Sequence, residues 1–243
     1  MKLIVKNKTS NGFHRLQKLK REKGTYEDVK NNVSKSDYIR DEVLISLLEE
    51  QGYLCAYCMQ KINLGNSTIE HIIGQNYTKD SIELGKENEI NYDNLLAVCE
   101  GKSCKDNLHC DKSRAKYQKN RPLYSNPLEN RIMQNIRFSE KGLIYYKDFL
   151  EIEEIEKLKK HDELDEDSNI KYDLHKVLNL NCENLKLKRV YLINALKKFT
   201  HNLSSQERIK KELDKYSNKL NNEYEELSQV AIYFLSKKLK AKK

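Results

Sequence analysis

The chain has 243 residues, 34% charged and 38% hydrophobic, and apolar positions recur along nearly its whole length, which excludes a disordered chain. It has no apolar run long enough to cross a membrane and no signal-peptide pattern, so we expect a cytoplasmic protein whose cysteines are metal ligands or free thiols rather than disulfides. Lysine and arginine outnumber aspartate and glutamate by 45 to 37, and the charge of +8 makes nucleic acid a reasonable partner, although any lysine-rich chain has this composition.

The first 37 residues are polar and basic and have few regularly spaced apolar positions. They predict a basic arm or a loosely packed start. Residues 37–51 predict a helix that ends at Gly52, a residue suited to a C-terminal cap. The apolar positions of this helix fall on one face: Val43, Leu44, Leu47 and Leu48.

Two short apolar runs, at 67–73 and 95–98, have the length and composition of β-strands. The polar stretch 76–92 between them predicts a loop. Pro122 and Pro127 stand in an irregular segment and mark the end of a module that begins near residue 38.

The remainder, 131–243, predicts a helical region, with an acidic stretch at 161–167 that connects two helices. Ser204 and Glu207 form a capping-box pair at the start of a long apolar stripe. The stripe predicts one helix of about 30 residues, and its members are Ile209, Leu213, Tyr216, Leu220, Tyr224, Leu227, Ala231 and Phe234. The whole sequence therefore predicts a mostly helical α+β protein with an arm (1–37), a cysteine-bearing module (38–130) and a helical region (131–243).

Five of the six cysteines lie within the module. Cys55 and Cys58 form a CxxC pair, whose turn can point two thiolates at one zinc ion. Cys99 ends an apolar run and is favoured as the third ligand, and the fourth is Cys104 or Cys110. The spacing predicts a structural zinc site of four cysteines. Such a site has no open coordination position, so any chemistry must come from other residues.

A carboxylate and an imidazole stand side by side at Glu70-His71, between the two halves of the cysteine set. Asn94 and Asp111 follow downstream, near the second half. A histidine flanked by isoleucines is more often structural than catalytic, but a neutral imidazole can accept a proton near pH 7. A hard cation, Mg²⁺ or Mn²⁺, could bind the carboxylates together with a phosphate. The group predicts hydrolysis of a phosphodiester.

These motifs resemble those of zinc-stapled HNH endonucleases over about residues 38–130, and most of all those of the HNH subunit of Septu anti-phage systems, including the retron-associated versions. Four sequence segments carry the resemblance: Leu54-Cys55-Ala56-Tyr57-Cys58, Ile69-Glu70-His71-Ile72, Tyr92-Asp93-Asn94-Leu95-Leu96 and Cys110-Asp111-Lys112. The resemblance implies a small ββα-metal module, embedded in or followed by the helical region.

It also implies a role for each residue. His71 would be the general base, and Glu70 and Asp111 would bind the catalytic cation. Asn94 would hold the loop that faces His71 and fix the imidazole. Cys110 becomes the favoured fourth zinc ligand because Asp111 follows it directly, although the insertion at 100–109 departs from the family pattern and leaves Cys104 as an alternative.

Four basic residues follow Asp111 and are candidates for phosphate contacts, although a solvated helix face would look the same: Arg114, Lys116, Lys119 and Arg121. The resemblance implies a DNA-cutting effector of prokaryotic defence, with an ABC/SMC-like ATPase as a partner that docks on the helical region. The alternative is a zinc-stabilised adaptor for nucleic acid or protein that has no catalytic activity.

Overall fold

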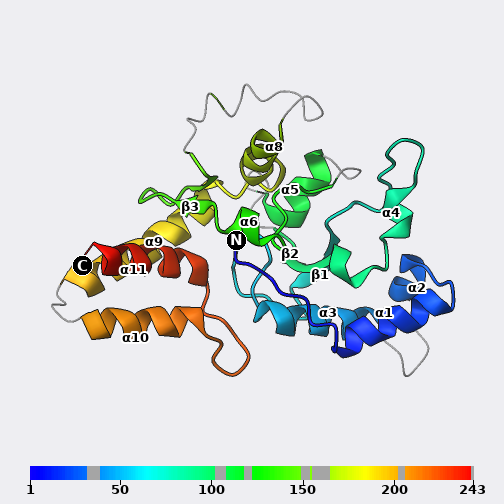
Figure 1. The fold of residues 1–243 in the computed structure, drawn as a ribbon, viewed down its shortest axis with the longest axis horizontal. Coiled ribbons are helices and arrows are strands. Elements are labelled where there is room, and N and C mark those ends of the chain that lie inside the picture. The colour runs from blue at the N-terminus through cyan, green and yellow to red at the C-terminus, as the bar shows by residue number, and fades with distance from the viewer. Residues whose placement is uncertain are drawn as a thin grey trace.

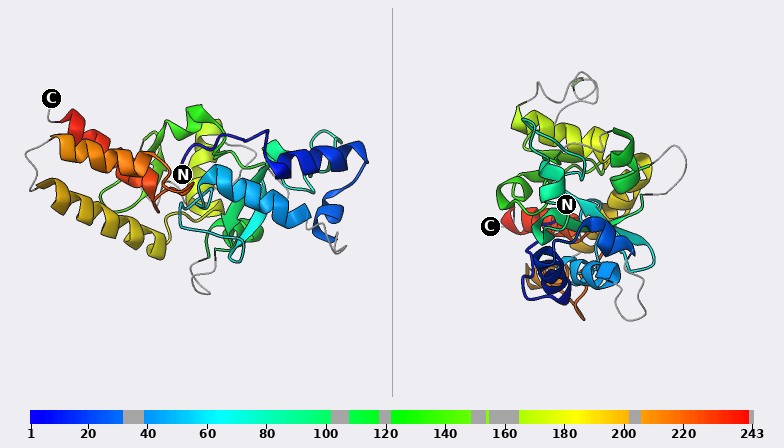
Figure 2. Two further views of the ribbon diagram at one scale, coloured as in Figure 1. Left: turned by 90° about the horizontal axis from the view of Figure 1, so that it is seen from below. Right: turned by 90° about the vertical axis from the view of Figure 1, so that its right-hand side faces the viewer.

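The fold is described from a computed structural model, which covers residues 1–31, 39–101, 108–117, 122–148, 154, 165–201 and 206–241. Over these residues the protein is mostly helical, with two small antiparallel sheets of two strands each. The predicted α+β class is therefore confirmed. The helices surround the sheets, and the molecule is longer than it is wide (Figures 1 and 2). Within the described residues, no helix is long and apolar enough to span a membrane.

The N-terminal region is packed against the rest of the protein, contrary to the expectation of a loose arm. It forms α1 (Asn11–Arg21) and α2 (Tyr26–Asn31), which pack on α3 (Ile39–Gln51) (Figure 1). Its buried apolar side chains belong to Met1, Ile4, Leu16, Leu19, Tyr26 and Val29. Their irregular spacing conceals this burial in the sequence. α3 confirms the helix expected there, and Gly52 adopts the left-handed cap conformation, with φ +60°.

The cysteine-bearing module contains the two expected strands. β1 (Ser67–His71) and β2 (Leu95–Cys99) are antiparallel, and His71 stands opposite Leu95. The segment between them, predicted as a loop, also contains the short helix α4 (Leu84–Glu87) and a 3-10 turn, η1 (Tyr92–Asn94). α5 (Cys110–Tyr117) follows β2 and contacts it, so the order is strand, strand, helix.

The region after residue 130 is less purely helical than expected. It contains a second hairpin, β3 (Ile136–Phe138) and β4 (Ile144–Tyr146), whose strands are too short to give a clear periodicity. The helices are α6 (Asn130–Met133), α8 (Glu166–Tyr172), the π-helical turn η2 (Asp173–Val177), α9 (Glu183–His201), α10 (Gln206–Ser217) and α11 (Ser228–Lys240).

The expected single helix after residue 204 is wrong. The chain turns back after α10, so that α10 and α11 lie side by side (Figures 1 and 2). Asn221, Asn222 and Leu227 have positive φ angles in this turn, a conformation incompatible with a continuous helix. Ile209, Tyr216, Leu227 and Ala231 of the apolar stripe are buried, whereas Leu220 is 73% exposed and lies in the turn. The stripe did not reveal the turn, since the apolar spacing continues through it.

Candidate functional site

Four cysteines form a compact cluster that could hold a metal ion such as zinc. The Sγ atoms of Cys55, Cys58, Cys99 and Cys110 all lie within 4.8 Å of one another. Cys55 and Cys58 come from the turn after α3, Cys99 ends β2, and Cys110 begins α5. The cluster therefore joins three elements of the module. Cys104, the alternative fourth ligand, lies outside the described residues.

The spacing of the sulfurs fits zinc. A tetrahedral site with Zn–S bonds of about 2.3 Å places its sulfurs about 3.8 Å apart. The Sγ atoms of Cys55 and Cys110 are 3.8 Å apart, and those of Cys58 and Cys99 are 3.7 Å apart. His109 is buried beside this set, with its Nδ1 atom 3.2 Å from the Cys110 sulfur. A set of four thiols at these distances is suited to a soft, closed, structural site.

Glu70, His71 and Asp111 line one pocket of about 210 Å³. Glu70 and His71 end β1, and Asp111 lies in the first turn of α5, directly after the cysteine that begins that helix. The antiparallel pairing of β1 with β2 and the cysteine cluster together bring α5 alongside the strand. The rest of the lining comes from Gly74, Gln75, Asn76, Arg114 and Ala115.

The imidazole of His71 is held in one orientation. Its Nε2 atom donates to the Glu89 carbonyl oxygen at 2.9 Å, which leaves the lone pair on Nδ1. Burial lowers the pKa of His71 to about 4, with the charges of Arg114 and Lys30 acting in the same direction. The side chain is therefore neutral at pH 7 and able to accept a proton. Its 8% exposure keeps one edge at the pocket.

Asn94 ties down the loop that supplies this carbonyl. Its Oδ1 accepts from the Ile73 amide at 2.7 Å, and its Nδ2 donates to the carbonyls of Ile73 at 3.1 Å and Asn88 at 3.0 Å. Asn88 precedes Glu89, so one side chain links the end of β1 to the backbone that orients His71.

The Glu70 carboxylate lies between the guanidinium of Arg114 and the carboxylate of Asp111. Arg114 Nη1 donates to Glu70 Oε1, and the same guanidinium donates to the carbonyls of His71 at 2.5 Å and Ile72 at 2.9 Å. Burial raises the pKa of Glu70 to about 7, against the charge of Arg114 and together with the like charge of Asp111. Two converging carboxylates, one of them poorly solvated, favour a bound cation.

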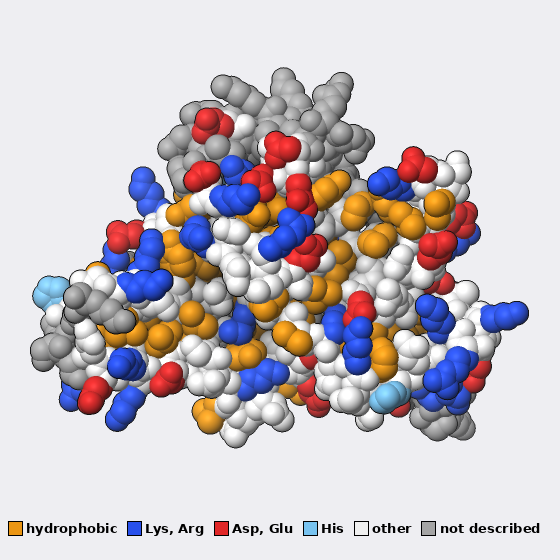
Figure 3. Space-filling view, viewed as in Figure 1, with side chains coloured by type: hydrophobic (Ala, Val, Ile, Leu, Met, Phe, Trp, Pro, Cys, Tyr) orange, Lys and Arg blue, Asp and Glu red, His pale blue; other side chains and the backbone are white. Residues whose placement is uncertain are grey.

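Of the four residues expected to contact phosphates, the structure describes two, Arg114 and Lys116, and only Lys116 is exposed. Arg114 is only 4% exposed and is engaged with β1, so it is a partner of Glu70 rather than an exposed phosphate contact. Lys116 is exposed on α5, whereas Lys119 and Arg121 lie outside the described residues. On the face in Figure 3, lysine and arginine side chains are interleaved with aspartate and glutamate.

The sequence singles out Arg114, but as a candidate phosphate contact, and it gives no sign of Tyr26 or Glu89. Basic residues usually lie at the surface, whereas Arg114 is buried beside Glu70. Tyr26 packs its ring against His71, and Glu89 supplies the carbonyl for Nε2. Both lie in segments with no recognisable motif. No signal in the sequence could have joined them to His71, because only the tertiary fold brings them close.

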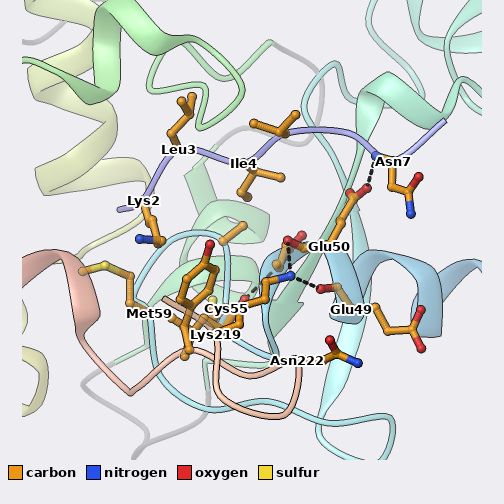
Figure 4. A pocket seen from close by; sticks show the side chains of 15 residues that line it. Lys2, Leu3, Ile4, Asn7, Glu49, Glu50, Cys55, Met59, Lys219 and Asn222 are labelled. Carbon is orange, nitrogen blue, oxygen red and sulfur yellow. Dashed lines mark hydrogen bonds between the residues drawn. The ribbon is translucent and has the colours of Figure 1, made fainter. Parts of the chain in front are cut away.

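A larger hollow of about 520 Å³ lies beneath the N-terminal segment (Figure 4). The charged groups around this hollow form structural contacts with the end of α3. Lys219 Nζ donates to the carbonyl of Glu49 at 2.5 Å, at the end of α3. The Glu50 carboxylate accepts from Lys6 Nζ at 2.8 Å and from the Asn7 amide at 2.9 Å. The contacts of Lys6 and Asn7 attach the N-terminal segment to α3, and the contact of Lys219 attaches the turn after α10 to the same helix.

No protein-family model matches this chain, and no curated protein matches it either. The geometry of the cysteine cluster and of the neighbouring pocket is therefore what bears on function.

Proposed function

We propose that this chain is a metal-dependent endonuclease of the HNH type, which hydrolyses phosphodiester bonds of nucleic acid, DNA in the first instance. One observation carries the proposal. Glu70, His71 and Asp111 line the same pocket beside the cluster of four cysteines, although Asp111 is distant from the other two in the sequence. A base and two carboxylates in one small polar cavity are the groups that metal-assisted hydrolysis requires.

In this proposal His71 is the general base. Because the Nε2–H group donates a hydrogen bond to the Glu89 carbonyl, Nδ1 is the atom that takes the proton from the attacking water. The pKa of about 4 keeps this atom unprotonated before substrate binds. A phosphate bound next to it brings negative charge, which raises the proton affinity of the imidazole as the reaction begins. Asn94 acts indirectly, by fixing the backbone that carries the Glu89 carbonyl.

Glu70 and Asp111 would hold the catalytic Mg²⁺ or Mn²⁺. Arg114 occupies Oε1 of Glu70, so Oε2 is the atom that we assign to the cation. When bound, the cation would offset the negative charge that develops on the phosphorus oxygens and on the leaving oxygen. Arg114 holds the Glu70 carboxylate in place and favours its ionised form. Zinc at the four cysteines would stabilise the fold without taking part in the reaction.

The biological setting follows the motif resemblance stated above. The chain would act in the cytoplasm as the nuclease effector of a prokaryotic anti-phage complex. An ABC/SMC-like ATPase would be its partner, docking on the helical region after residue 130. Lys116, which is exposed on α5, would contribute to phosphate binding, as would Lys119 and Arg121.

Plasmid cleavage in Mg²⁺ or Mn²⁺ tests the proposal, with the wild type compared with His71→Ala. Loss of the general base should slow cleavage by about 10²- to 10⁴-fold. The matched control is His201→Ala, an exposed histidine at the end of α9 that should leave the rate unchanged. Equal cleavage by the wild type and His71→Ala would reject the assignment. A zinc-loaded wild type that cuts neither alone nor with its ATPase partner would favour the adaptor function.

A further inference from the structure

Arg189, in the middle of α9, is a buried cation whose hydrogen-bond acceptors are all neutral. The residue is 1% exposed. Its Nε donates to the Gly142 carbonyl at 2.5 Å, and its Nη2 donates to the Leu180 carbonyl at 2.6 Å and to Asn181 Oδ1 at 3.5 Å. These contacts use Nε and Nη2, and none of their acceptors neutralises the charge. A buried charge without a counter-charge is strongly destabilising, so the position calls for an anion nearby.

The local backbone connects Arg189 to the cysteine cluster. The segment 178–181 accepts from the guanidinium at Leu180 and Asn181, and its Leu178 carbonyl accepts from the Cys110 amide at 2.9 Å. Asn179 in the same segment donates to the Leu108 carbonyl at 2.8 Å. Arg189 and the start of α5 therefore both form hydrogen bonds with the segment 178–181.

The electrostatics agree with this geometry. Burial lowers the pKa of Arg189 to about 10, and the thiols of Cys182, Cys58 and Cys110 act in the opposite direction. The guanidinium is still protonated at pH 7. Two of these three thiols belong to the cysteine cluster, so the cluster is part of the charge environment of Arg189.

A zinc ion bound by four thiolates carries a formal charge of −2, because four negative ligands exceed the two positive charges of the metal. Three of the four cysteines are buried and Cys99 is half-buried, so water can solvate such a charge only weakly there. A permanent cation fixed nearby would offset part of it. Arginine is suited to this position, since its guanidinium remains charged when buried, whereas a lysine readily loses its proton.

We propose that Arg189 is the counter-charge of the zinc–thiolate centre, and that it also positions the 178–181 segment that holds Cys110. The proposal rests on zinc occupying the four cysteines and does not depend on the nuclease reaction. It makes α9 a component of the metal site, although α9 follows the last ligand by more than seventy residues. Gly142 supports this arrangement. A Cβ there would lie 2.4 Å from the Lys186 carbonyl, so only glycine lets the β3–β4 turn reach Arg189.

Two substitutions separate the charge from the hydrogen bonds. Arg189→Lys keeps a positive charge but loses the planar fork, whereas Arg189→Gln keeps amide donors and loses the charge. Zinc affinity of the full chain is measured by chelator competition, together with the sulfur-to-metal charge-transfer absorption of the cobalt-substituted protein. Arg189→Gln should bind zinc about 10- to 100-fold more weakly than the wild type. Arg189→Lys should retain most of the affinity and the wild-type cobalt spectrum.

The matched controls are Arg131→Lys and Arg131→Gln. Arg131 is an exposed arginine that pairs with Glu166 and Glu129, so both controls should bind zinc as the wild type does. Equal zinc affinity in Arg189→Lys and Arg189→Gln would overturn the counter-charge role, including the case in which both lose zinc completely, and would leave Arg189 a structural residue. A wild type without zinc would overturn the metal site itself, which plasmid cleavage does not measure.

Discussion

The rings of Tyr26 and His71 pack edge to face, with the ring centroids 4.5 Å apart and the planes at 82°. The Tyr26 amide donates to the Glu89 carboxylate at 3.1 Å, and the Glu89 carbonyl accepts from His71 Nε2 at 2.9 Å. The three residues form a closed ring of contacts around the imidazole. They come from α2, from the segment after α4 and from β1, so the N-terminal region helps to position the candidate base.

Replacing Tyr26 tests this positioning. Tyr26→Leu removes the aromatic edge that fixes the imidazole, and we expect cleavage to slow by about 10- to 100-fold, because misplacement of a reacting group by about 1 Å has effects of this size. Tyr26→Phe keeps the edge contact and should keep the wild-type rate. Nitrogen NMR of His71 gives a readout besides activity, since the Nε2-protonated tautomer should dominate in the wild type and in Tyr26→Phe. Equal rates for the Leu and Phe variants would exclude the role.

Asn94 should contribute mainly to stability. Asn94→Ala removes three hydrogen bonds to the backbone of Ile73 and Asn88 and leaves buried partners unsatisfied. We expect the free energy of unfolding to fall by about 3 kcal/mol. Urea unfolding measures it, with Asn218→Ala as the control. Asn218 makes one exposed bond, to the Asp214 carbonyl, so its loss should change stability by less than about 0.5 kcal/mol. Similar effects in both variants would contradict the supporting role.

The cysteine cluster predicts which thiols matter. Cys58→Ser should lower the zinc content of the purified protein and its melting temperature, because metal binding and folding of the module are coupled. Cys182→Ser replaces a buried thiol outside the cluster and should leave zinc content at the wild-type level. Metal analysis and thermal unfolding, with and without a chelator, report both. Full zinc content in Cys58→Ser would show that this sulfur is not a ligand.

The raised pKa of Glu70 gives a pH-dependent prediction for the catalytic cation. Because this pKa is raised from an ordinary value of 4.5 to about 7, the stability contributed by Glu70 is present below pH 4.5 and is lost as the pH rises through 7. Mg²⁺ binds the ionised carboxylate and should restore it, so the rise in melting temperature on adding Mg²⁺ should be larger at pH 8 than at pH 5.5.

Glu70→Gln should abolish this rise, and Asp111→Asn should reduce it. His71 remains in both variants, so its own titration, which has the opposite sign, is common to all three proteins. The shift is measured on zinc-loaded protein without nucleic acid, so it does not depend on cleavage. A Mg²⁺ shift that is the same in the wild type and in Glu70→Gln would place the cation elsewhere.

Local sequence patterns were sufficient to predict much of the cysteine-bearing module. The CxxC pair and Cys99 have spacings that follow from zinc geometry, and β1 and β2 have the apolar composition of short strands. Glu70, His71 and Asp111 could be grouped because each lies next to one of these elements. In each case the signal resides in neighbouring residues, where spacing along the chain sets spacing in space.

The sequence by itself determined the fold class, the strand pair and three of the four clustered sulfurs, and it left Cys104 and Cys110 as alternatives for the fourth. Only the tertiary structure decided that the N-terminal region is packed, that α10 turns back into α11, and that Arg114 and Arg189 are buried. The physical reason is that a charge or an apolar side chain is stabilised by whatever surrounds it in three dimensions. For Tyr26 and Arg114 those surroundings come from segments more than forty residues away, and Arg189 joins Leu180, nine residues away, to Gly142, 47 residues away.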